Sequence, residues 1–223
     1  ATAIEHKHTV KIFDRNIDLD KKHFLNFLME FNPNIIGFTC MTSPMLLDII
    51  YLGPLIKKIL PATTIVIGGV HATVEPESVL NEPYVDYIIR GEGEEAFLEF
   101  CDTFDKNPKN LKKLKNVNNN PLRPYVDINK LKFPDYSLID LSKYGQFFIG
   151  TGRGCPGNCS FCYNIGMWGK DGHSCVRVLD TERTKALFKE AIEKYGITDF
   201  TIMDDNFITF KKRSIEVAKF LEE

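Results

Sequence analysis

The sequence predicts an α/β protein with two successive units, each built around a parallel sheet. Short apolar runs alternate with helical patterns over residues 10–104, and the alternation starts again after residue 144. Near-continuous apolar strands are typical of parallel sheets that helices cover on both faces. With 43% hydrophobic and 26% charged residues, the chain of 223 residues has the composition of a globular protein with a core of normal size.

The first unit is expected to alternate strands and helices from its start. Apolar runs bounded by turn residues predict strands at VKIF (10–13), IIGFT (35–39), IVIGG (65–69) and within VDYIIRGEGE (85–94). Apolar residues at helical spacing predict helices at 20–30, 45–60 and 94–104. Glycine turns at the carboxyl ends of parallel strands line the edge where such sheets bind ligands, so we expect a binding crevice there.

A change of composition separates the two units. Residues 106–137 are rich in Lys, Asn and Pro, and we expect a linker over 106–143 between domains at 1–105 and 144–223. The order βαβα in the second domain predicts the opening of a parallel barrel or an open sheet. Its expected elements are the strand QFFIGT (146–151), a helix at 181–195, the strand DFTIMDD (199–205) and a helix from 211.

The helix at 181–195 has signals at both ends. Asp180 or Thr181 can cap its start, and Gly196 suits its end. Helical spacing predicts that its inward face carries Leu187, Ala191, Ile192 and Tyr195.

Charge and hydropathy exclude several classes of protein. A net charge of −2 gives no basic field for nucleic acid or an anionic membrane, so we expect neither as a partner. No apolar run approaches the roughly 18–20 residues that span a bilayer. Six cysteines without a signal-peptide pattern indicate the cytoplasm, where clustered cysteines bind metals more often than they form disulfides. The first residue is not Met and the last ones, KFLEE, lie in a predicted helix, so we expect part of a longer protein.

Half of the six cysteines lie in one glycine-rich loop, GTGRGCPGNCSFCYN. Cys155, Cys159 and Cys162 have the spacing CxxxCxxC. Thiolates at this spacing can hold an iron–sulfur cluster, or three positions of a zinc site whose fourth ligand would be His173 or Cys175. Three cysteines on a cubane [4Fe–4S] cluster leave one iron without a protein ligand, and an open metal position is the mark of a reactive site.

This loop closely resembles the CxxxCxxC motif of the radical S-adenosylmethionine enzymes, in which an aromatic residue, here Phe161, precedes the third cysteine. The resemblance implies a partial TIM-like (βα)6 barrel and a [4Fe–4S] cluster whose open iron binds S-adenosylmethionine, with Phe161 and Gly154 beside that cofactor. Family members often carry a Gly-Gly-Glu-like segment at the end of the second strand. Here MDDN (203–206) replaces it, and Asp204 or Asp205 is expected to bind the ammonium or ribose, or else to cap a turn.

The glycine turns of the first unit carry a second resemblance. IVIGGVHATVEPE and VDYIIRGEGEEAF are typical of the cobalamin-binding domain that precedes many radical S-adenosylmethionine barrels, a Rossmann-like, flavodoxin-type fold. In that family a histidine motif would fall ahead of residue 1, so the first strand and helix of the domain are expected to be missing. His71 is expected to line the pocket and not to bind cobalt. The resemblance implies a cobalamin site at Thr39, Met41, Thr42, Gly68, Gly69, His71, Gly91, Glu92 and Gly93.

Together the two resemblances imply a radical S-adenosylmethionine enzyme of the cobalamin-dependent type. Such enzymes cleave S-adenosylmethionine reductively to a 5′-deoxyadenosyl radical and use it for methyl transfer, cyclisation or oxidation. The substrate is expected to be a small molecule or a peptide, and the electron donor a flavodoxin or ferredoxin. The chain by itself is expected to be inactive, because later barrel strands that contact substrate in this family are absent from it.

Two alternatives stay open at this point. A radical methylthiotransferase would need a second cluster in its first domain, where Cys40 and Cys101 lie, and both are expected to be buried apolar residues. A non-catalytic metal-binding module would hold zinc or an iron–sulfur cluster in the same loop. Metal analysis separates these readings, since zinc without sulfide contrasts with about four irons and four sulfides.

Overall fold

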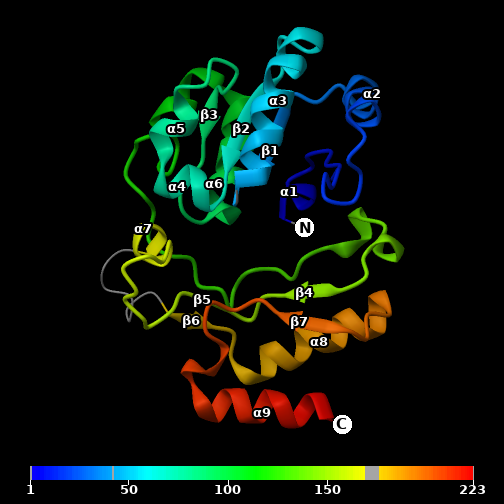
Figure 1. The fold of residues 1–223 in the computed structure, drawn as a ribbon, viewed down its shortest axis with the longest axis vertical. Helices are drawn as coiled ribbons and strands as arrows, with labels where there is room; N and C mark the ends of the chain where they lie inside the picture. The colour runs from blue at the N-terminus through cyan, green and yellow to red at the C-terminus, as the bar shows by residue number, and fades with distance from the viewer. Residues whose placement is uncertain (1, 42, 169–175, 223) are drawn as a thin grey trace. The chain divides into compact units, whose positions relative to one another are not determined.

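The fold was analysed in a computed structural model, which describes residues 2–41, 43–168 and 176–222. The chain forms two compact units, Thr2–Tyr125 and Val126–Glu223. Figure 1 shows helices and strands in each unit, and the described strands form one three-stranded sheet in the first unit and two separate two-stranded sheets in the second. Because each unit has its own core, the two are described separately.

The first unit is built on a parallel sheet of three strands in the order β1-β2-β3. Ile36 pairs with Ile65 and Ile67 pairs with Ile88, and the β2–β3 ladder starts two residues further along β2 than the β1–β2 ladder. Its strands are β1 (Ile35–Thr39), β2 (Thr64–Gly68) and β3 (Tyr87–Ile88). Its helices are α1 (Thr2–Glu5), α2 (Lys21–Phe31), α3 (Ser43–Ile59), α4 (Val70–Val74), α5 (Pro76–Leu80), α6 (Gly93–Lys106) and the 3-10 helix η1 (Pro108–Lys113).

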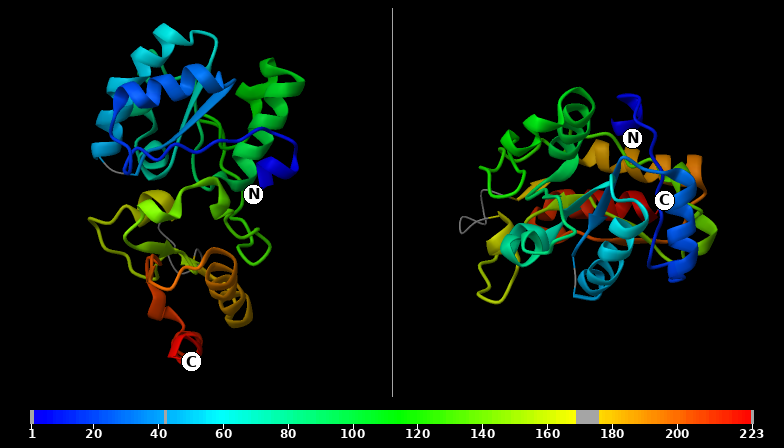
Figure 2. Two further views of the ribbon diagram at one scale, coloured as in Figure 1. Left: turned by 90° about the vertical axis from the view of Figure 1, so that its right-hand side faces the viewer. Right: turned by 90° about the horizontal axis from the view of Figure 1, so that it is seen from above.

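Successive side chains of β2 enter two different cores, because a strand points them to opposite faces. Ile65 and Ile67 pack with residues of α2 and α3, whereas Val66 packs with Phe100 of α6. Figure 2 shows α6 on the other side of the sheet from α2 and α3. Helices therefore cover both faces, and the expected parallel α/β arrangement of this unit is confirmed.

The prediction of a strand at 10–13 is wrong. Residues 7–20, all described, form neither helix nor strand, and the Ile12 side chain is 48% exposed. Side chains anchor the segment, since the Phe13 ring lies 5.1 Å from that of Phe24 and 5.0 Å from that of Phe27, and Arg15 Nε donates to Asp48 Oδ2 at 2.9 Å. A strand forms only when its backbone finds a partner, and side-chain contacts do not supply a ladder.

The boundary between the units differs from the linker expected at 106–143. Residues up to 125 belong to the first unit. Leu111 and Val117 are 1% and 0% exposed and complete the core under α6. The many Asn, Lys and Pro residues of this segment interrupt the helical spacing of its apolar residues, although some of those apolar residues are buried. The segment therefore resembled a surface linker in the sequence.

The second unit contains a parallel pair, β4 (Phe147–Ile149) with β7 (Phe200–Ile202), in which Phe147 lies opposite Phe200. The expected strand–helix–strand–helix order is confirmed. An antiparallel pair, β5 (Gly152–Arg153) with β6 (Arg177–Val178), was not anticipated. The other elements are α7 (Asn164–Trp168), α8 (Thr181–Tyr195), α9 (Lys211–Glu222), and the 3-10 helices η2 (Tyr136–Leu138), η3 (Leu141–Lys143) and η5 (Phe207–Thr209).

Helix α8 begins and ends as predicted. The Asp180 side chain accepts a hydrogen bond from Arg183 N, and Gly196 ends the helix in a left-handed conformation with φ 67°. The prediction for one residue of the inward face is wrong, because Ile192 is 42% exposed. Phe188, fully buried, occupies the core beside Leu187 instead.

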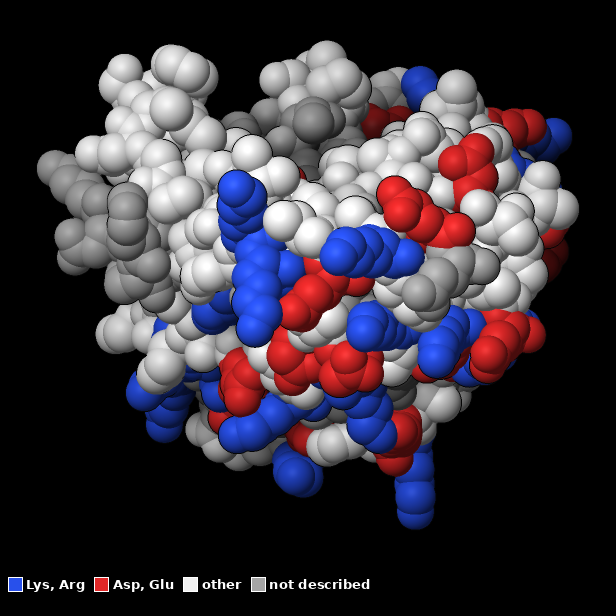
Figure 3. Space-filling model, turned by 90° about the horizontal axis from the view of Figure 1, so that it is seen from below, with Lys and Arg blue, Asp and Glu red and all other residues white. Residues whose placement is uncertain are grey.

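The surface shows no sign of a membrane-spanning segment in the part of the chain that is described, where every helix is too short or too polar to cross a bilayer. Figure 3 shows the face that carries α9, on which basic and acidic side chains are interspersed. This mixing agrees with the small net charge of −2.

Candidate functional site

The cysteine loop leaves β5 at Arg153 and ends at α7. Cys155 and Cys162 are half-buried, Cys159 is exposed, and all three thiols are free. A Cβ atom placed on Gly157 would lie 3.4 Å from Cys155 Sγ and 3.9 Å from Cys159 Sγ. The glycine therefore lets two of the thiols approach one stretch of backbone.

The donor set of this loop, three free thiols, is one that a cubane cluster can use. Among residues 2–41, 43–168 and 176–222, no three His, Cys, Asp or Glu side chains converge on a point where one metal ion could bind. A cubane cluster does not need such a point, because each iron takes its own cysteine. His173 and Cys175, the alternative zinc ligands, lie outside the described residues.

The two carboxylates after β7 bind the backbone around the start of the loop. Asp204 Oδ1 accepts from Thr151 N at 2.6 Å and Gly152 N at 2.8 Å, and its Oδ2 accepts from the Thr151 hydroxyl at 2.7 Å. Asp205 Oδ2 accepts from Gly154 N at 2.8 Å. Sequence reasoning assigned both carboxylates to S-adenosylmethionine or to a turn, and the structure gives them protein donors.

Asp205 has a second partner, the hydroxyl of Tyr163, which donates to its Oδ1 at 2.7 Å. Burial and the carboxylate raise the pKa of Tyr163, so the phenol stays protonated and remains a donor at neutral pH. Gly154 is buried with φ 80°, a conformation that favours glycine. Phe161, placed by sequence beside S-adenosylmethionine, is 91% exposed.

A buried arginine near the loop was missed by sequence reasoning. Arg213 is 7% exposed and donates to Leu179 O at 2.7 Å and to Thr151 O at 3.0 Å. Burial lowers its pKa, while the charge of Asp204 acts in the opposite direction. An arginine in the first turn of α9 carries no sequence signal for burial, because arginine is usually at the surface.

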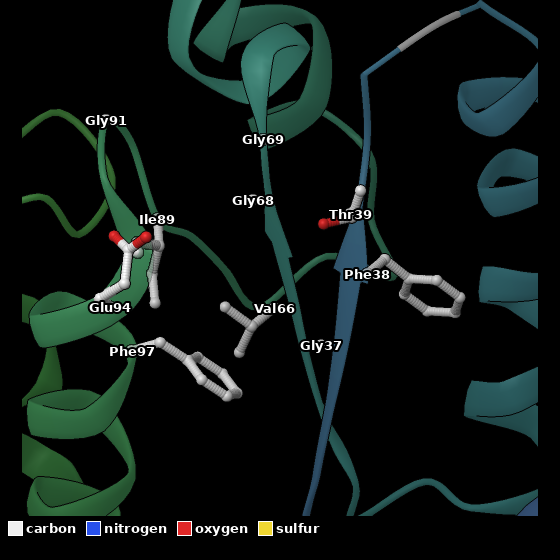
Figure 4. A pocket seen from close by; sticks show the side chains of 11 residues that line it. Gly37, Phe38, Thr39, Val66, Gly68, Gly69, Ile89, Gly91, Glu94 and Phe97 are labelled. Carbon is white, nitrogen blue, oxygen red and sulfur yellow. The ribbon is translucent and has the colours of Figure 1, made fainter. Parts of the chain in front are cut away.

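The first unit contains a pocket of about 430 Å³ at the carboxyl ends of β1 and β2, on the face that α6 covers. Figure 4 shows the side chains of Val66, Ile89, Phe97 and Glu94 around it, whereas the ring of Phe38 points away. The pocket is lined by Gly37, Phe38, Thr39, Val66, Gly68, Gly69, Ile89, Gly91, Gly93, Glu94 and Phe97.

The structure brings together five of the residues that sequence reasoning assigned to cobalamin, namely Thr39, Gly68, Gly69, Gly91 and Gly93. Three others are not among the lining residues. Met41 is 52% exposed, Glu92 precedes α6, and His71 Nε2 lies 3.0 Å from Ser78 Oγ. Thr42 lies outside the described residues.

Gly69 is the lining residue that most needs to be glycine. Its φ is 97°, and a Cβ there would lie 2.7 Å from Cys40 O. Sequence reasoning missed Gly37, Val66 and Phe97. Strand alternation could have found the first two, since Gly37 shares a face with Thr39 and Val66 shares one with Gly68.

The two cysteines of the first unit are buried, as expected. Cys40 is 0% exposed and Cys101 is 8% exposed. Burial raises the pKa of Cys40, and burial followed by repulsion from Asp105 and Asp102 raises that of Cys101 to about 11. Neither thiol is suited to be a reactive ligand.

Comparison with known proteins places this fold among cobalamin and S-adenosylmethionine proteins. Residues 1–101 match the family model described as B12 binding domain. An uncharacterized methyltransferase of Pyrococcus horikoshii is 34% identical over 98% of this chain and 50% of its own length. An anaerobic magnesium-protoporphyrin IX monomethyl ester cyclase of Cereibacter sphaeroides is 27% identical over 86% of this chain and 33% of its own length.

Among solved structures, the radical S-adenosylmethionine methyltransferase TsrM of Kitasatospora setae, with cobalamin and a [4Fe-4S] cluster bound, matches with a TM-score of 0.73. The match covers 98% of this chain and 46% of TsrM at 17% identity, and therefore shows the fold alone. The chain spans half or less of the relatives it matches.

Proposed function

The chain belongs to the cobalamin-binding radical S-adenosylmethionine protein family, and from this premise we propose that the full-length protein is a cobalamin-dependent radical S-adenosylmethionine methyltransferase. The observation that carries the proposal is the presence of two distinct sites on one chain. One is the glycine-lined pocket at the strand ends of the first unit, and the other is the loop with three free thiols. Methyl transfer is preferred because the relative with 34% identity is a methyltransferase.

Each cofactor would have its own residues. Cys155, Cys159 and Cys162 would hold the cluster, and the lining residues of the pocket would hold part of cobalamin. When bound, an open-iron cluster supplies the electron for cleavage of S-adenosylmethionine, and cobalamin supplies a carrier for the methyl group. The protein binds and orients these groups and keeps out side reactions.

The pocket suits a phosphate-bearing tail more than a whole corrin ring. Its volume of about 430 Å³ is in the lower half of the range for ligand pockets. Gly68 and Gly69 present backbone without side chains, so a bulky group can come close to the end of β2. Val66, Ile89 and Phe97 give the pocket an apolar floor for an aromatic base.

We propose a small-molecule or peptide substrate and a flavodoxin or ferredoxin as electron donor, since a one-electron reductant is needed. The free thiols of the loop favour the reducing environment of the cytoplasm. The similarity to the cyclase supports a second reaction on the same cofactors, in which the substrate is cyclised.

The test is anaerobic reconstitution of the full-length protein with iron, sulfide and cobalamin, followed by addition of S-adenosylmethionine and a reductant. We expect about four irons and four sulfides per chain, retained cobalamin, and consumption of S-adenosylmethionine. Formation of S-adenosylhomocysteine supports methyl transfer, whereas 5′-deoxyadenosine alone favours cyclisation or oxidation. One zinc without sulfide would instead support a non-catalytic module.

A further inference from the structure

Both ends of the cysteine loop are bound to one carboxylate. Gly154, whose N–H donates to Asp205 Oδ2 at 2.8 Å, immediately precedes Cys155. Tyr163, whose hydroxyl donates to Asp205 Oδ1 at 2.7 Å, immediately follows Cys162. The carboxylate therefore joins the residue before the first cysteine to the residue after the third.

We propose that Asp205 is a positioning residue for the cluster, which closes the cysteine loop at both ends and holds its thiols ready for iron. The proposal rests on the proposed function, because it assumes that this loop holds the cluster. It gives Asp205 a role that differs from both expectations from the sequence, a contact with S-adenosylmethionine and the capping of a turn.

The chemistry of the two hydrogen bonds supports this role. An ionised carboxylate accepts stronger hydrogen bonds than a neutral group does, and each Asp205 oxygen has one donor. Residues 154–163 form neither helix nor strand, so regular backbone pairing does not hold the loop. Fixing both ends of such a loop lowers the conformational entropy that cluster binding would otherwise remove.

The adjacent carboxylate has a different task. Asp204 binds the backbone of Thr151 and Gly152. Both residues precede the first cysteine, so Asp204 does not join the two ends of the cysteine loop. Only Asp205, of these two, reaches the far end of the loop through Tyr163. Removing Asp205 should therefore loosen the thiols while the contacts between the ends of β4 and β7 stay in place.

The test compares the full-length wild-type protein with Asp205→Ala, Asp205→Asn and Tyr163→Phe after anaerobic reconstitution with iron and sulfide. Asp199→Ala, at an exposed aspartate just before β7, is the matched control. The readouts are the rate at which a chelator removes iron and the EPR spectrum of the reduced cluster, recorded with and without S-adenosylmethionine. Mutation of a residue that orients metal ligands typically lowers metal affinity about 10–100-fold.

We expect Asp205→Ala to lose iron about 10-fold faster than wild type, with a broadened EPR signal. The rates of iron loss of Asp205→Asn and Tyr163→Phe should lie between those of wild type and Asp205→Ala, because each of these variants keeps one of the two hydrogen bonds. Asp199→Ala should match wild type. If Asp205→Ala does not fold, the graded effect of Tyr163→Phe decides, because Tyr163 is 45% exposed and its ring stays.

Two results would overturn the proposal. In one, Asp205→Ala and Tyr163→Phe keep the wild-type rate of iron loss and the wild-type spectrum. In the other, only the spectral change on adding S-adenosylmethionine disappears, which would make Asp205 a ligand of that cofactor. Failure of the proposed function is distinct from both, since the wild-type protein itself would then hold no cluster.

Discussion

The glycine-lined pocket and the cysteine loop are built in opposite ways. The pocket lies where β1, β2 and α6 meet, and its backbone sets its shape. The cysteine loop has no regular structure over residues 154–163 and is held by side chains that follow β7. A backbone-built pocket is sensitive to added atoms, whereas a loop held by side chains is sensitive to their removal.

The largest expected effect is the loss of the cluster without any loss of cobalamin binding. Cys155→Ala should abolish the cluster, because two thiolates cannot hold the irons that three hold. Cobalamin binding should not change, since every lining residue of the pocket belongs to the first unit. Iron and sulfide analysis and the visible absorbance of retained cobalamin measure both outcomes. Loss of cobalamin from this variant would contradict the independence of the sites.

In the metal-free chain, the cysteines of the two regions should differ in their rate of alkylation. At pH 8 the thiol of Cys101, with a pKa of about 11, is ionised in about one molecule in a thousand. Cys40 is 0% exposed, whereas Cys159 is exposed. Peptide mass spectrometry should therefore show Cys159 labelled at least about 100-fold faster than Cys40 or Cys101.

The pH dependence of this labelling has a definite sign. The native fold raises the pKa of Cys101 above the ordinary 9.0, so it favours the protonated thiol. Its contribution to stability is present below pH 9 and is lost as the pH rises toward about 11. Labelling of Cys101 should rise about tenfold from pH 8 to pH 9, whereas a thiol with the ordinary pKa of 9.0 would rise only about fivefold, so a rise of about fivefold or less would contradict the raised pKa.

A smaller effect concerns the backbone of the pocket. Gly69→Ala puts a Cβ 2.7 Å from Cys40 O at a φ of 97°. We expect the free energy of unfolding to fall by about 2 kcal/mol. Gly93→Ala is the control, because its Cβ meets nothing within 4 Å. Urea unfolding compares the two variants, and equal stabilities would show that the turn after β2 is not restricted.

Gly37→Val tests the space in the pocket without changing its turns. A Cβ at Gly37 lies 3.4 Å from Phe97 Cζ, and the two methyl groups of valine would extend into the pocket. Valine suits a strand, so the fold should be kept. We expect cobalamin affinity to fall about tenfold, or about 1.4 kcal/mol, by titration followed through absorbance. Unchanged affinity would place the ligand elsewhere.

The smallest effect is electrostatic and belongs to the cysteine loop. Asn206 Nδ2 lies 4.0 Å from Cys155 Sγ and donates to it. Such donors stabilise the reduced, more negative cluster. Asn206→Ala should lower the midpoint potential by about 20–60 mV, equivalent to one hydrogen bond of about 0.5–1.5 kcal/mol. A redox titration followed by EPR measures it, and a higher potential would contradict the assignment.

Sequence reasoning predicted the features that depend on neighbouring residues. The runs IIGFT and IVIGG gave β1 and β2, and Asp180 and Gly196 marked the ends of α8, because caps and apolar runs are local. It failed at 10–13, where a strand needed a distant partner. Burial of Leu111 within an irregular segment was equally hidden, because it depends on packing across the unit.

For the sites, the CxxxCxxC spacing singled out the three cysteines, and the place at predicted strand ends, together with a family resemblance, singled out the glycine turns. The neighbours of those residues could not be predicted in the same way. Asp205 meets Gly154 across 51 residues and Tyr163 across 42 residues of sequence. No local pattern encodes such contacts, so the carboxylates were assigned either to a cofactor or to a turn, whereas the structure pairs them with the loop.

The pairing of β4 with β7 also affects the order in which the chain can fold. The contact between Thr63 and Pro33, at the start of β1 and β2, joins residues 30 positions apart, whereas Thr151 and Asp204 are 53 apart. Closing the longer loop costs about 0.5 kcal/mol more entropy, and distant contacts slow folding. The first unit also leaves the ribosome earlier. The glycine-lined pocket should therefore be complete while the cysteines are still on an unfolded segment.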